Sequence, residues 1–150
     1  MAVEPRIKPL SHSRPASAAL LLLRLIAGSA FVIHGWAKMH HPASWGGPNS
    51  PFPGFLQFLA AISEFFGGIA WIVGLVTPFA SLGIGFTMAV AVETLLLSWR
   101  LPFVSQKGGP SYELAAAYLA ISAVLLALGP GKYSLDSLIF GERSGTDKKG

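Results

Sequence analysis

Six ionisable side chains lie within or at the edges of long apolar stretches, and they are the residues of this chain best placed to do chemistry. They are Arg24, His34, Lys38, Glu64, Glu93 and Glu113. A charge in hydrocarbon is costly, so intramembrane ionisable residues commonly mark binding sites or proton pathways. We expect His34, Glu64 and Glu93 to be catalytic by exchanging protons, and the other three to contribute to ligand binding.

Arg24 also has a structural explanation. Its long side chain could form a buried salt bridge or cap backbone carbonyls inside a helical bundle. Glu64 lies within reach of it, and Asp136 is an alternative partner if the chain folds back after the last apolar stretch. We expect the structural role to outweigh substrate binding at this position.

Three of the other residues have simpler roles open to them. Glu113 follows Gly109-Pro110-Ser111, where an acidic residue favours the positive end of a helix dipole. Lys38 can extend its ammonium group to the membrane interface. His34 can be a core histidine bonded to a backbone carbonyl, although its near-neutral titration also suits proton relay.

Composition predicts an all-α integral membrane protein. Hydrophobic residues make up 52% of the 150 positions, charged residues make up only 12%, and the mean hydropathy is +0.55. Because a transmembrane helix needs about 20 residues, four crossings and their loops occupy almost the whole chain. The eleven Lys and Arg residues are scattered, so we expect a lipid bilayer as partner and no nucleic acid.

The apolar stretches predict a four-helix transmembrane domain over 17–140, between a basic tail at 1–16 and a flexible tail at 141–150. The expected helices run at about 17–38, 55–76, 79–99 and 111–128. Short connections favour an antiparallel bundle. Cys is absent, which excludes disulfides, thiolate nucleophiles and cysteine-ligated clusters. His40 and His41 are adjacent and do not form a metal-binding pattern, so no metal site is expected.

Charge distribution predicts that both termini are cytoplasmic. Seven Lys and Arg residues lie in the two tails and three lie in the loops after the first and third helices, which fits the positive-inside rule. This orientation gathers five of the six ionisable residues in the outer half of the bundle and leaves Arg24 alone in the inner half. We therefore expect a site that opens outward beneath the proline-rich loop at 39–54.

Four motifs of glycine, aromatic and ionisable residues occur in order along the chain. They are Arg24-x3-Gly28-x2-Phe31-x2-His34-Gly35-x2-Lys38, then Glu64-x2-Gly67-Gly68 with Gly74-x2-Thr77-Pro78, then Tyr112-Glu113-Leu114-Ala115, and finally Gly129-Pro-Gly-Lys-Tyr-Ser-Leu-Asp136. In this order and spacing the chain resembles the DoxX family of small four-helix membrane proteins of bacteria and archaea. The resemblance spans most of the chain from Leu20 to Asp136.

The resemblance implies a multi-pass protein of the bacterial inner membrane that acts as an oxidoreductase or oxidoreductase subunit. Related DoxD-type proteins are linked to thiosulfate oxidation with a quinone as electron acceptor, and other DoxX proteins are associated with redox-stress complexes. The wider superfamily includes relatives with maturation or carrier-like roles, so the fold does not fix the activity. The resemblance provides no agreed catalytic residues.

Three hypotheses follow. In the first, the bundle holds a quinone between the first two helices and a redox partner protein supplies electrons, because the chain has no redox centre of its own. In the second, it is a binding or transport module for a small acid or apolar compound, acting as a homo-oligomer. In the third, it is a membrane scaffold that recruits an enzyme.

Overall fold

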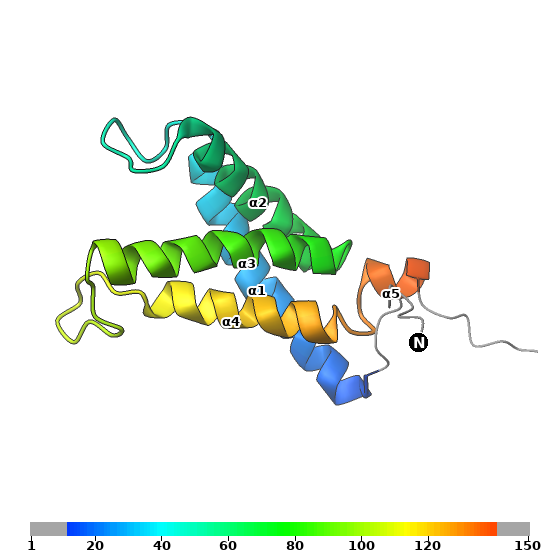
Figure 1. Cartoon of the computed structure of the whole chain (residues 1–150). Coiled ribbons are helices and arrows are strands. Elements are labelled where there is room, and N and C mark those ends of the chain that lie inside the picture. The colour runs from blue at the N-terminus through cyan, green and yellow to red at the C-terminus, as the bar shows by residue number, and fades with distance from the viewer. Residues whose placement is uncertain (1–11, 141–150) are drawn as a thin grey trace, which may run out of the picture.

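A computed structural model describes residues 12–140, and all regular secondary structure in that range is helical (Figure 1). The elements are α1 (Arg14–Met39), α2 (Gly54–Val73), α3 (Thr77–Glu93), the π-helix η1 (Thr94–Ser98), α4 (Glu113–Leu128) and α5 (Leu135–Phe140). Residues 1–11 of the expected basic tail and the expected flexible tail at 141–150 lie outside the described residues.

Three helical segments are long and apolar enough to cross a bilayer: α1, α2, and α3 continued by η1 as Thr77–Ser98. The fourth apolar helix, α4, has 16 residues, which gives it a length of about 24 Å. That is shorter than the hydrocarbon core of a typical bilayer, about 30 Å thick. The described chain is thus a multi-pass membrane protein with three to four apolar helices.

The observed ends of α1 and α2 differ from the expected ones for local reasons. The first helix starts at Arg14 rather than 17, because Ser13 caps it by accepting a bond from the backbone N–H of Ala16 (3.3 Å) and Pro15 occupies its first turn. Proline, which lacks a backbone N–H, is tolerated there because an N–H in the first turn would have no partner within the helix. The second helix ends at Val73 because Gly74 adopts a left-handed conformation with φ of 68°.

The helices pack as two pairs, α1 with α2 and α3 with α4 (Figure 1). In the first pair Gly28 faces Gly68 so closely that a Cβ on Gly28 would lie 2.8 Å from the Gly68 carbonyl oxygen. Small residues allow such close approach between membrane helices. From the turn at 74–76, α2 and α3 separate toward their other ends (Figure 1).

A small core lies where the two pairs meet. Its buried hydrophobic residues are Leu20, Ala27, Phe31, Trp71, Ile84, Met88 and Leu125. The rings of Phe31 and Trp71 pack edge to face with centroids 5.5 Å apart, and the Trp71 indole donates to the Ser81 hydroxyl at 3.0 Å. Many other large apolar side chains are exposed, including Ile26, Phe79 and Phe86, as expected for helices that face lipid.

Candidate functional site

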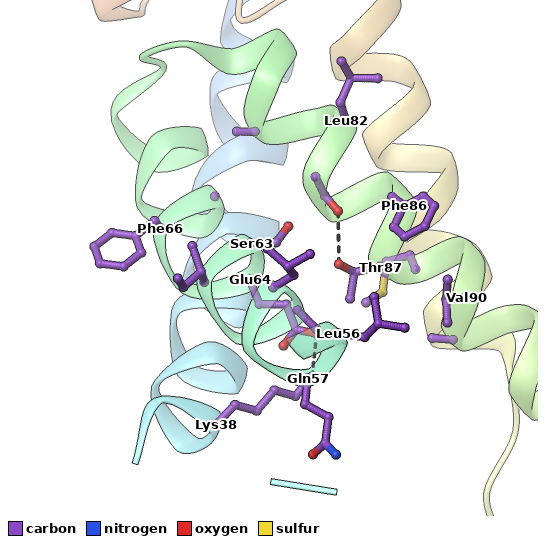
Figure 2. Close-up of a pocket in the computed structure, with 18 of the residues that line it drawn as sticks. Lys38, Leu56, Gln57, Ser63, Glu64, Phe66, Leu82, Phe86, Thr87 and Val90 are labelled. Carbon is purple, nitrogen blue, oxygen red and sulfur yellow. Dashed lines mark hydrogen bonds and ion pairs between the residues drawn. The ribbon is translucent and has the colours of Figure 1, made fainter. Parts of the chain in front are cut away.

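A cavity of about 880 Å³ lies in the wedge between α2 and α3 (Figure 2). Its walls are mainly apolar and include Leu56 and Phe66 from α2 and Leu82, Phe86 and Val90 from α3. The polar side chains along the wall are few, and most of them belong to the end nearer the loop between α1 and α2. The shape and composition suit an apolar molecule with one polar end.

An ion pair between Lys38 and Glu64 borders this cavity (Figure 2). The Lys38 ammonium lies 2.5 Å from Glu64 Oε1, and the exposed fractions of the two side chains are 23% and 2%. The second carboxylate oxygen, Oε2, is also buried but has no hydrogen-bond partner among residues 12–140. The Lys38 ammonium is further held 4.3 Å from the centre of the Trp45 ring, a favourable cation–π contact.

Gln57 fixes the loop that covers this end of the cavity. Its side-chain oxygen accepts from the Gly46 N–H at 2.7 Å, its amide nitrogen donates to the Phe52 carbonyl at 2.9 Å, and its backbone carbonyl accepts from the Trp45 indole at 2.8 Å. Both aromatic residues line the cavity. The proline-rich loop is thus anchored to the first turn of α2.

The opposite wall changes from α3 to the π-helix η1 beside the same end of the cavity. Thr94 opens η1 and donates its hydroxyl to the Val90 carbonyl at 2.8 Å, while Leu95 and Trp99 line the cavity beyond it. Short π-helical segments are rare and often occur at functional sites. Here the segment places apolar side chains opposite the ion pair.

Arg24 lies away from the cavity, in a second buried polar cluster. Its side chain is 1% exposed and donates to the carbonyls of Pro130 (2.7 Å), Tyr133 (2.8 Å) and Ile72 (3.5 Å). The prediction that Arg24 caps backbone carbonyls is therefore confirmed. The prediction that it reaches Glu64 is wrong, because Glu64 is paired with Lys38.

Asp136 completes the cluster around Arg24, from the segment that returns after α4. Its two carboxylate oxygens accept the backbone N–H groups of Val76 (2.7 Å) and Thr77 (2.9 Å), and its own N–H donates to the Gly74 carbonyl (2.8 Å). Asp136 thus caps the N-terminus of α3 from a distant part of the chain. A Cβ on Gly74 would lie 2.5 Å from Arg24 Nη1, so this cluster is fully packed.

The other three candidates lie apart from both clusters. His34, Glu93 and Glu113 are exposed on α1, α3 and α4, and none of them lines the cavity. The structure therefore brings Lys38 and Glu64 together, and does not bring the expected set of six into one site. Within residues 12–140 it also shows no cluster of three His, Asp or Glu side chains suited to a metal ion.

The family model for DoxX matches residues 19–99, more than half of the chain. This chain belongs to the DoxX family. The matched range holds Arg24, Lys38, Glu64 and Glu93, whereas Glu113 and Asp136 lie beyond it. Comparisons with curated proteins and with solved structures found no match.

Two residues that shape the cavity of this DoxX protein were not among the sequence candidates. Gln57 is a buried amide within an apolar helix, and its position in the first turn of α2 was an available signal. Trp45 lies in the proline-rich loop at 39–54. Its stacking on Lys38 depends on the path of an irregular loop, which hydrophobic periodicity does not predict.

Proposed function

We propose that this DoxX protein is the membrane component of a quinone-linked oxidoreductase system and that the cavity between α2 and α3 holds the quinone. The observation that carries the proposal is an ion pair between the partly exposed Lys38 and the buried Glu64, beside a large apolar cavity. The polar ring would lie beside the ion pair and the hydrocarbon tail along the apolar wall. The volume is within the usual range for ligand pockets, about 300–1,000 Å³.

The two charged residues have complementary abilities toward such a ring. Lys38 uses one of its three donors on Glu64, so it can also donate to a ring oxygen. Glu64 can accept a proton through Oε2, which is buried and has no partner among the described residues. A bound quinone carries electrons together with protons, and in this proposal a redox partner protein supplies the electrons.

The proposal includes a membrane orientation. Four apolar helices of a domain at 17–140 cross the bacterial inner membrane in alternating directions, with both termini in the cytoplasm, as the distribution of Lys and Arg favours. Lys38 then lies near the outer surface, beneath the loop anchored by Gln57. Arg24 and Asp136 lie near the cytoplasmic surface.

Blocking the cavity tests the proposal. Thr87 lines it from α3, whereas Ala89, on the same helix, is exposed and does not line it. We expect Thr87→Phe to weaken binding of duroquinone to the detergent-purified chain at least tenfold, measured by quenching of tryptophan fluorescence, and Ala89→Phe to leave it unchanged. Absence of binding of both duroquinone and duroquinol to the unmodified protein would refute the proposed function.

One observation favours a second candidate, a carrier for small apolar or acidic compounds. The cavity wall extends from Lys38 and Trp99 at one end to Val76 and Phe79 at the other, so it follows most of the length of α2 and α3. A continuous path of this kind suits movement of a molecule between the two membrane surfaces. Benzoate uptake into proteoliposomes that Thr87→Phe abolishes would support transport, and equal uptake with and without the protein would exclude it for this probe.

A further inference from the structure

The two oxygens of the Glu64 carboxylate have different surroundings. Oε1 accepts from the Lys38 ammonium, whereas Oε2 is buried and has no donor within the part of the chain that the structure describes. A buried acceptor that lacks a hydrogen bond is unfavourable, and more so when it carries charge. Because the terminal torsion of a glutamate is soft and roughly two-fold, the carboxylate can turn Oε2 toward a molecule in the cavity that it borders.

The neighbouring polar side chains do not supply the missing donor. The amide group of Gln57 is bonded to the loop at both its oxygen and its nitrogen. The hydroxyls of Thr87 and Thr94 donate to carbonyls one turn earlier in their own helices. Ser63 lines the cavity with a buried hydroxyl that has no partner, but its neighbour in space is Gly83 on α3.

Lys38 gains less from a hydrogen bond to a ligand than Glu64 does. Its ammonium is bonded to Oε1 and lies over the Trp45 ring, and the side chain is partly exposed. Water can therefore accept hydrogen bonds from its remaining N–H groups. The polar end of the cavity therefore offers a partly exposed donor, which water can reach, and a buried acceptor that no residue of 12–140 satisfies. A ligand with a hydroxyl group matches both, since its oxygen can accept from Lys38 while its hydrogen is donated to Glu64.

We infer that the cavity between α2 and α3 recognises a ligand whose polar end donates a hydrogen bond to Glu64, so that a quinol binds more tightly than the corresponding quinone. The inference rests on the proposed function and names the redox form that the site prefers. A quinone can bond to Lys38 but leaves Oε2 buried without a donor. Because hydrogen bonds to charged groups are among the stronger ones, we expect a preference of about tenfold or more.

Three related probes test this on the full chain in mild detergent under anaerobic conditions. They are duroquinol, duroquinol dimethyl ether and duroquinone, which share one ring and differ in the hydroxyl hydrogens. Trp45 and Trp99 line the cavity, so quenching of their fluorescence reports binding, and calorimetry checks the affinities. We expect duroquinol to bind at least tenfold more tightly than the ether and the quinone.

Variants then assign the preference to one residue. Glu64→Leu should bind duroquinol and its ether within about threefold of each other, while Ser63→Ala should keep the full preference. Loss of the preference in Ser63→Ala instead would overturn the assignment to Glu64. Equal binding of all three probes to the unmodified protein would overturn the inference but leave the proposed function standing, whereas no binding of any quinone or quinol would refute both.

Discussion

The two ends of this molecule treat a buried charge in opposite ways. Around Arg24, the two terminal guanidinium nitrogens donate to backbone carbonyls from two distant segments, Nε has no partner among the described residues, and even Gly74 has no room for a methyl group. Around Glu64, the carboxylate has one partner and borders a cavity of about 880 Å³. Both side chains are almost fully buried, so burial alone does not separate a structural charge from a functional one.

The difference lies in what each charge has beside it. The Arg24 cluster joins three parts of the chain: α1, the turn after α2, and the segment that follows α4. Its hydrogen bonds hold these parts in one arrangement and leave no space for a ligand. The Lys38–Glu64 pair joins only α1 and α2, and the helix that would close the other side, α3, stands away from it.

Replacing Arg24 should give the largest effect on stability. Arg24→Met removes the donors to three backbone carbonyls and the positive charge near Asp136, so we expect a loss of about 3 kcal/mol in the free energy of unfolding. Thermal unfolding in detergent measures the change. Arg14→Met, at the exposed start of α1, is the matched control, and a similar loss in both variants would contradict a special role for Arg24.

Gly74→Ala should have the next largest effect. Alanine there is strained at φ of 68° and its Cβ would press on Arg24 and Ser134, which should cost about 2 kcal/mol or more. Gly47 has a φ of 77° but no atom within 4 Å of the added Cβ, so Gly47→Ala should cost only the backbone strain, about 1 kcal/mol. Equal melting temperatures for the two variants would show that packing around Gly74 is unimportant.

Asp136→Asn should destabilise the protein by about 1 kcal/mol, because the amide can accept from only one of the two N–H groups at the start of α3. The same change should leave duroquinone affinity within about twofold if the two ends act independently. A larger loss of affinity at full folding would show that the capped turn controls the cavity. Calorimetric titration beside a melting curve distinguishes these results.

The smallest effects are expected at the exposed residues. Glu93→Gln and His34→Gln should each change the free energy of unfolding by no more than about 0.5 kcal/mol and should leave duroquinone binding unchanged. A tenfold loss of binding in either variant would show that these side chains reach a site that one copy of the chain does not form. That result would assign the residue to the same binding site as Lys38 and Glu64.

The sequence predicted the class of fold, because apolar length is a local signal. Its six ionisable candidates included the buried Arg24 and Glu64, but also His34, Glu93 and Glu113, which are exposed. It also identified carbonyl capping by Arg24 and the return of Asp136 as alternatives. It could not separate His34 from Gly35 as the residue facing α2, because a spacing of three or four residues fits both. Gly35 packs against the backbone of Phe65, and His34 therefore points away.

The pairing of Lys38 with Glu64 and the cavity itself needed three-dimensional information. Which residues of α1 meet which residues of α2 depends on how far one helix is shifted along the other, and the close contact of Gly28 with Gly68 decides that shift. The cavity depends on the angle between α2 and α3, which no local pattern specifies. The capping of α3 by Asp136 joins residues 59 and 60 positions apart, beyond the range of any helical motif.

That long-range cap also has a consequence for how the protein is made. During synthesis from the N-terminus, α2 and α3 are complete well before Asp136 leaves the ribosome. The turn between them therefore remains uncapped until then. The turn between α2 and α3 would then be fixed late, when residues 129–136 dock against α1. A nascent chain stalled before Asp136 should expose this turn to proteolysis, and release of the next few residues should protect it.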